Sequence, residues 1–116
     1  MAMCSMAQVH LDVSEPETAE SEAKRALELF GGRSDYLQGI GTAQLVLGRA
    51  LLAQDHLIEA EEILVAADKT FEQLSSVSHR AAAWVAQGDL AQKRNEDRKA
   101  ARLYRRAAEA LQDFRF

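Results

Sequence analysis

Apolar residues recur every three or four positions along almost the whole chain, which is the spacing of one face of an α-helix. No segment shows the strict alternation of apolar and polar residues that is typical of a β-strand. Together with its glycines and its single proline, this pattern predicts an all-α protein. The predicted helices cover about 2–12, 16–30, 35–53, 57–75, 78–93 and 97–113.

Local signals support several of the predicted helix ends. Gly31-Gly32 predicts the end of the second helix, because glycine adopts the left-handed conformation that closes many helices. Asp55 and Asp97, or their immediate neighbours, are expected to cap the helices that follow them. Two glycines in the segment YLQGIGT each cost a helix about 1 kcal/mol relative to alanine, so we expect the third helix to start late.

The chain repeats itself at one constant spacing when 41–75 is laid over 81–115. The matching pairs are Gly48 with Gly88, Ala60 with Ala100, Leu64 with Tyr104, and Ala67 with Ala107. A weaker copy lies upstream at nearly the same spacing, where Ala19, Ala23, Ala26 and Phe30 precede Ala60, Leu64, Ala67 and Phe71. We therefore predict one domain, 1–116, with a degenerate repeat at about 1–33 and two further repeats at about 34–76 and 77–116.

Glycine recurs at the same point inside two predicted helices. A residue without a side chain lets two helix backbones approach, and the packing gained can offset the lost helix propensity. We expect Gly48 and Gly88 to be the crossing points of two helix hairpins, with Ala60 and Ala100 as the small residues that face them. Trp84, one turn before Gly88, is expected to cover the last hairpin.

The spacing of Trp84, Gly88, Ala100, Tyr104 and Ala107 resembles the tetratricopeptide repeat. The middle copy keeps this pattern at Gly48, Ala60, Leu64 and Ala67, and departs from it at Gln44. The common repeat has about 34 residues, and the longer spacing from Gly48 to Gly88 resembles the longer-helix variety found in bacterial regulators and some scaffold proteins. The resemblance implies a right-handed α-solenoid of about three antiparallel helix hairpins, whose first helices line a concave groove.

The same resemblance implies a function without catalysis, namely binding a protein or peptide ligand in the groove as a scaffold or adaptor. An alternative is that the chain is the C-terminal, effector-binding part of a larger bacterial transcription regulator. Carried over onto this sequence, the groove-facing positions are Gln8, Leu11, Leu45, Arg49, Leu52, Val85, Asp89 and Gln92.

Charge is distributed unevenly around a formal total of −4. Residues 1–92 hold 14 acids and 6 Lys/Arg (−8), whereas 93–116 hold 8 Lys/Arg and 4 acids (+4). A basic stripe with Arg98, Arg102, Arg105 and Arg106 meets only the charge criterion for a nucleic-acid site. We favour a solvated helix face with some pairing such as Arg105 with Glu109, and expect no direct nucleic-acid binding.

Candidate chemistry is sparse. His10, His56 and His79 lie far apart, and none shares a metal-ligand spacing with Cys4, so we expect no metal and no cofactor. We expect no histidine to activate Cys4 or a serine, and the chain is not expected to be an enzyme. A single cysteine and the absence of a long apolar run indicate a cytoplasmic protein without a membrane span.

The last predicted helix carries an apolar stripe with no further helix to cover it. Uncovered apolar surface commonly marks an interface, and two-fold dimers are the commonest assemblies. We therefore expect a homodimer. The stripe consists of Leu103, Ala107, Leu111 and Phe114, followed by Phe116.

Overall fold

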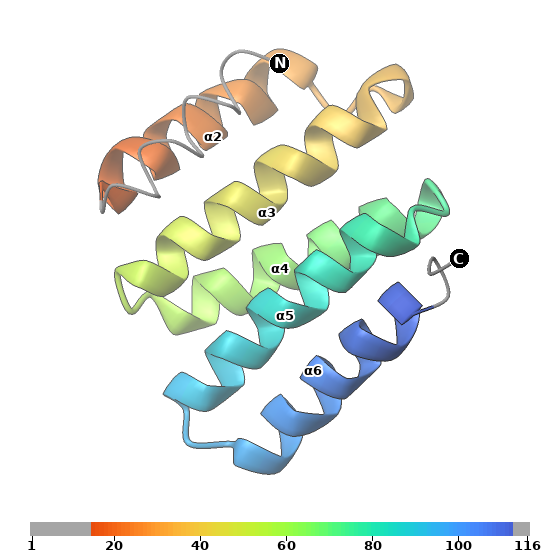
Figure 1. Cartoon of the computed structure of the whole chain (residues 1–116). Helices are drawn as coiled ribbons and strands as arrows, with labels where there is room; N and C mark the ends of the chain where they lie inside the picture. The colour runs from red at the N-terminus through yellow and green to blue at the C-terminus, as the bar shows by residue number, and fades with distance from the viewer. Residues whose placement is uncertain (1–14, 113–116) are drawn as a thin grey trace.

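The computed structural model describes residues 15–112, which form five α-helices and one short 3-10 turn (Figure 1). The elements are α2 (Pro16–Phe30), η1 (Ser34–Tyr36), α3 (Leu37–Ala53), α4 (Leu57–Gln73), α5 (Val77–Lys93) and α6 (Asp97–Gln112). The all-α prediction is confirmed, and observed and predicted helix ends agree within two residues. The helix predicted at 2–12 lies outside the described residues.

Helix α3 begins late, as expected, because η1 occupies the residues before Leu37. Gly39 and Gly41 lie inside the helix and are buried. A Cβ atom at Gly41 would stand 2.6 Å from Cε1 of the Phe71 ring, so the glycine leaves room for an aromatic side chain of α4. The tertiary contact thus explains why a poor helix former is placed there.

The three connections between α3 and α6 share one backbone geometry. Asp55, Ser75 and Asn95 stand at equal intervals along the chain and adopt the left-handed conformation, with φ of 62°, 54° and 61°. The N–H of the residue after each of them donates to a carbonyl in the last turn of the preceding helix, as from His56 to Leu51 at 2.9 Å. This is the Schellman arrangement, and it ends these three helices at the same register.

The expected caps are therefore corrected. Asp55 occupies the left-handed position after α3, and the residue before α4 is His56, whose side chain makes no capping hydrogen bond. Asp97 is the first residue of α6. The Schellman hydrogen bonds satisfy carbonyl groups at the end of the preceding helix, and the left-handed conformation places Asp55 in that turn, one residue before the cap position of α4. At Gly31, by contrast, the predicted helix end is confirmed, with φ of 58°.

Consecutive helices run in opposite directions and pack against each other, and α3 also contacts α5 (Figure 1). Small side chains fill most of the interfaces, because they allow the helices to approach closely. The repeat positions Ala60, Leu64 and Ala67 are fully buried. The weaker first copy behaves in the same way in α2, where the buried residues are Ala19, Ala23 and Ala26.

The glycines at the two hairpin crossings accommodate large side chains. A Cβ at Gly88 would lie 2.7 Å from Cε1 of Tyr104, and one at Gly48 would collide with Leu64. We expected Ala60 and Ala100 to face these glycines, but the nearest atoms belong to the residues one turn later. The missing side chains admit a leucine or an aromatic ring of the second helix, which fills more of the gap than an alanine could.

Replacement of Gly88 by leucine should lower the free energy of unfolding by about 3 kcal/mol, because the new side chain overlaps the Tyr104 ring. Adding Tyr104→Ala should cost less in this background than in the wild type, since the clash is then relieved. Chemical denaturation of the double-mutant cycle measures this coupling. Ala82→Leu, at an exposed position of the same helix, is the matched control and should change stability by less than about 0.5 kcal/mol.

Ser75→Gly should stabilise the protein by about 0.5 kcal/mol, because glycine removes the strain of the left-handed conformation and loses some of that gain to unfolded-chain entropy. Ala101→Gly in the exposed part of α6 should have the opposite sign and cost about 1 kcal/mol. Thermal melts of both variants check the assignment, and destabilisation by Ser75→Gly would contradict it.

Candidate functional site

The described residues that were predicted to face a groove lie on α3 and α5, the two helices that contact each other across the hairpin boundary. Arg49, Asp89 and Gln92 are exposed, Val85 is 39% exposed and Leu45 is half-buried. Leu52 lies in the core, with 8% of its surface exposed. Gln8 and Leu11 lie outside the described residues.

The least buried rows of α3 and α5 use equivalent repeat positions. On α5 the row is Ser78, Ala82, Val85, Asp89 and Gln92, all exposed. On α3 the row is Gln38, Thr42, Leu45 and Arg49, which are the equivalents, one repeat earlier, of the first four residues of the α5 row. These spacings place each row along one face of its helix. We call the two rows together the α3–α5 face.

Tyr104 reaches the α3–α5 face from α6. Its ring crosses α5 over Gly88, and its hydroxyl donates a hydrogen bond to Asp89 Oδ1 and lies 3.1 Å from Gln92 Oε1. The pKa of Tyr104 is raised to about 12, first by burial and then by the hydrogen bond to Asp89 and the negative charge of that carboxylate. The sequence pattern indicated only a packing role for Tyr104, and its spacing from Gly88 was the signal for this contact.

Arg49 and Asp89 give the two rows opposite charges at equivalent positions. No carboxylate within residues 15–112 forms an ion pair with Arg49, so its guanidinium keeps all of its donors for another molecule. The Asp89 carboxylate is oriented by the Tyr104 hydroxyl but remains exposed. The face thus offers an anion-binding group on α3 and a cation-binding group on α5.

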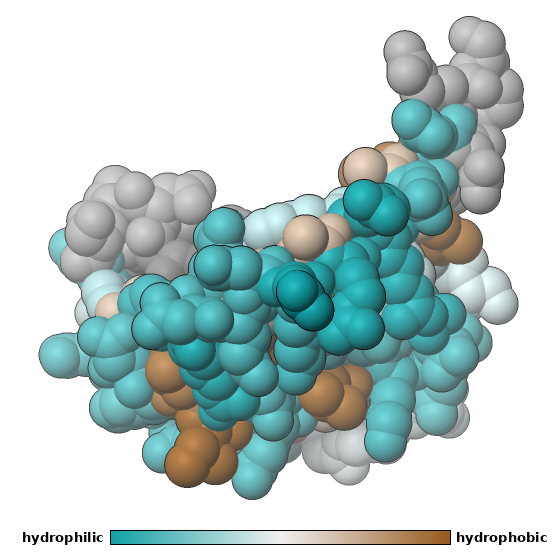
Figure 2. Space-filling view, turned by 90° about the horizontal axis from the view of Figure 1, so that it is seen from below, coloured by the Kyte–Doolittle hydropathy of each residue, from teal (hydrophilic) through white to brown (hydrophobic). Residues whose placement is uncertain are grey.

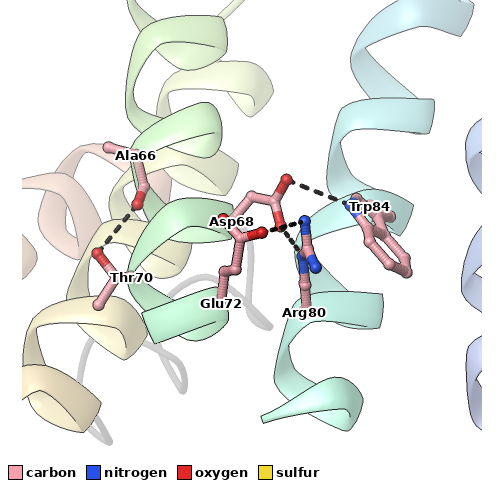
Figure 3. Close-up of polar contacts among 6 residues, drawn as sticks. All are labelled: Ala66, Asp68, Thr70, Glu72, Arg80 and Trp84. Carbon is pink, nitrogen blue, oxygen red and sulfur yellow. Dashed lines mark hydrogen bonds and ion pairs between the residues drawn. The ribbon is translucent and has the colours of Figure 1, made fainter. Parts of the chain in front are cut away.

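A polar cluster joins α4 to α5 behind this face (Figure 3). Arg80 Nε donates to Asp68 Oδ1 at 2.6 Å, and Trp84 Nε1 donates to Asp68 Oδ2 at 3.3 Å. The Arg80 guanidinium also forms an ion pair with Glu72 at 3.3 Å. Each polar group in the cluster therefore has a partner, and its role is to hold the two helices in register.

Two arginine side chains lie over the Trp84 ring. The guanidinium carbons of Arg80 and Arg106 lie 5.0 Å and 4.3 Å from the centre of the indole ring, within cation–π range. The ring is 6% exposed and packs with Ala107 and Leu103. The expectation that Trp84 covers the last hairpin is therefore confirmed.

Gln44, which departs from the repeat pattern, forms a polar contact between the two helices of the middle hairpin. Its Oε1 accepts a hydrogen bond of 2.7 Å from the hydroxyl of Thr70, a buried polar residue of α4. The same hydroxyl lies 3.0 Å from the carbonyl oxygen of Ala66, as Figure 3 shows. Gln44 thus replaces a bulky packing residue with a specific polar contact.

The end of α5 is tied to the preceding hairpin. Lys93 Nζ donates to Asp55 Oδ1 at 2.8 Å and to the carbonyl of Leu52 at 3.1 Å, and Arg94 pairs with Glu61 at 2.5 Å. Lys93 lowers the pKa of Asp55 through its hydrogen bond and its charge. These contacts hold α5 beside the turn between α3 and α4, and therefore keep the two rows of the α3–α5 face aligned.

The expectation that no histidine lies beside a serine is wrong at the start of α5, where Ser76 Oγ lies 2.6 Å from His79 Nδ1. No three His, Cys, Asp or Glu side chains in 15–112 come together as a metal site. Open hollows at Glu15–Thr18 and Asp55–Glu59 are each lined by one short segment, so neither brings groups from different helices together. No helix in the described range is both long and apolar enough to span a bilayer.

No protein-family model, curated protein sequence or solved structure matches this chain. The geometry of the described helices therefore carries the functional argument, and the tetratricopeptide pattern stays a resemblance.

The raised pKa of Tyr104 predicts a loss of stability at high pH. Because the folded pKa is about 12, against an ordinary value of 10.0, folding favours the neutral phenol. This contribution is complete below pH 10 and is lost as the pH rises towards 12. An ultraviolet titration in a Tyr36→Phe background follows Tyr104 alone, because the chain has 2 tyrosines. Asp89→Asn should lower the pKa of Tyr104 towards its ordinary value. If Tyr104 already titrates at the ordinary value when Asp89 is present, the contact with Asp89 is contradicted.

Proposed function

We propose that the chain is a non-catalytic binding module of the tetratricopeptide type, which holds an extended peptide segment of another protein along the α3–α5 face. The observation that carries this proposal is the pair of adjacent, least buried rows at equivalent positions, with the exposed Arg49 in one and the exposed Asp89 in the other. The sequence repeat, the shared turn geometry and the contact of α3 with α5 support a solenoid arrangement of the hairpins.

The charges define the peptide that suits this face. Packed helices lie about 8–10 Å apart, and an extended chain covers that distance with about three residues. A segment that crosses from α3 to α5 therefore meets Arg49 with an acidic residue and Asp89 with a basic residue about three positions away. Leu45 and Val85 provide apolar contacts between and beside the charges.

Preorganisation favours binding at Asp89. The Tyr104 hydroxyl fixes the carboxylate before a ligand arrives, so less side-chain entropy is lost on binding. The ties from Lys93 and Arg94 hold the rows in place, and a peptide can bind without a rearrangement of the helices. We propose that the module acts as a scaffold or adaptor.

A peptide array of acidic–basic pairs at different separations tests the proposal. Binding should be strongest at a separation of about three residues and should fall by at least about tenfold in the triple variant Leu45→Ala, Arg49→Ala, Asp89→Ala. Arg49→Asp with Asp89→Arg should prefer peptides with the reversed charge order.

The matched control is Arg25→Ala with Glu28→Ala, two exposed charges on α2 that should leave peptide binding unchanged. Array hits that survive the triple variant would show that the α3–α5 face is not the binding surface.

A further inference from the structure

The outer faces of α4 and α6 carry opposite charges at equivalent repeat positions. The exposed positions from Ile58 to Lys69 on the outer face of α4 each have an exposed equivalent on α6, one repeat later. The inverted pairs are Glu59 with Lys99, Glu62 with Arg102, and Lys69 with Glu109. The two helices therefore share one pattern of positions and differ in the sign of the charge at each of them.

One of these charges has a neighbour of opposite sign within residues 15–112, because Glu59 contributes, after Glu20, to the raised pKa of Lys24 on α2. None of the inverted side chains takes part in an ion pair or a hydrogen bond there. The expected pairing of Arg105 with Glu109 on α6 does not form. The Arg106 guanidinium is held over the Trp84 ring instead and is not part of this face. Both faces are therefore available to another molecule.

Exposed apolar residues on α4 also have suitable partners on α6. Ile58 is 73% exposed and Val65 39% exposed on α4, and their equivalents on α6 are Arg98 and Arg105. Arginine stems can cover apolar side chains while the guanidinium stays in water. Alignment of α4 with α6 at equivalent positions would thus cover Ile58 and Val65 as well as pair the charges.

The charge pattern selects the direction of this alignment. Two turns separate α4 from α6, so both helices run the same way in the molecule (Figure 1). In a parallel alignment, Glu59 and Glu62 meet the basic start of α6, and Lys69 meets Glu109. An antiparallel alignment would place Glu59 near Glu109 and Lys69 near Lys99, which is repulsive.

We propose that these two faces bind a second copy of this chain. A two-fold axis parallel to the helices places α4 of each copy along α6 of the other, so every contact occurs twice. The side of the molecule on which α6 lies is mostly hydrophilic, with small separate apolar areas (Figure 2). Charge therefore sets partner and direction, and the covered stems and aliphatic side chains add affinity.

This interface differs from the expected dimer along the apolar stripe of the last helix. Ala107 and Leu103 of that stripe pack against Trp84 within the chain, and Leu111 is the stripe residue of the described part that stays exposed, at 46%. Phe114 and Phe116 lie outside the described residues. The proposed interface leaves the α3–α5 face free, so its test is independent of peptide binding.

Charge reversal on one helix at a time tests the interface. An α4 variant (Glu59→Lys, Glu62→Lys) and an α6 variant (Lys99→Glu, Arg102→Glu) should each dimerise at least about 100-fold more weakly, because like charges then face each other twice. An equimolar mixture should form a heterodimer with wild-type affinity, since both of its α4–α6 contacts are again attractive. Sedimentation equilibrium measures all three samples against the 12.8 kDa monomer.

Matched controls keep this test sharp. Glu17→Lys with Glu28→Lys on α2 makes the same change in net charge as the α4 variant and should leave dimerisation unchanged. Dimerisation of the wild type should weaken as salt is raised. A wild type that stays monomeric at low salt and high concentration would overturn the proposal, and so would a mixture of correctly folded variants that forms no heterodimer.

Discussion

The crossing of α5 and α6 at Gly88 is the contact on which the other features of the C-terminal hairpin depend. Without a Cβ at this point, the Tyr104 ring lies directly against the α5 backbone. The close approach brings Ala107 under Trp84 and carries the phenol hydroxyl to Asp89 on the exposed face of α5. A single missing side chain thus links the packing of the hairpin to the chemistry of its exposed face. Gly48 and Leu64 make the corresponding contact in the middle hairpin.

The turns convert this local packing into a regular arrangement. Three helix ends close with the same backbone hydrogen bonds, and their left-handed residues stand at equal intervals along the chain. Equal helix lengths and equal turns bring α3 and α5 together at equivalent positions, and the ties from Lys93 and Arg94 hold them there. The exposed rows are therefore aligned by backbone geometry, whereas their chemistry is free to differ, as it does at Arg49 and Asp89.

We propose different partners for the two faces of the molecule. On the α3–α5 face, a fixed carboxylate and an exposed guanidinium stand beside partly exposed aliphatic residues, which suits an extended peptide. On the outer faces of α4 and α6, opposite charges occur at equivalent positions, which suits another helix of the same repeat. Since α3 and α5 supply one face and α4 and α6 the other, occupation of either face does not block the other.

The sequence by itself determined the five helices of the described residues, their ends within two residues and the repeat, because apolar periodicity and helix-breaking glycines are local properties of the chain. It also located Gly48 and Gly88 as crossing points and Trp84 as a covering residue. Only the tertiary structure decided which atoms meet there. Tyr104 rather than Ala100 lies over Gly88, and Asp55 adopts the left-handed conformation after α3 instead of capping α4. The sharing of Asp68 between Arg80 and Trp84, and the hydrogen bond from Tyr104 to Asp89, join residues on different helices. Such contacts depend on the rotation and separation of packed helices, which periodicity along one helix does not specify.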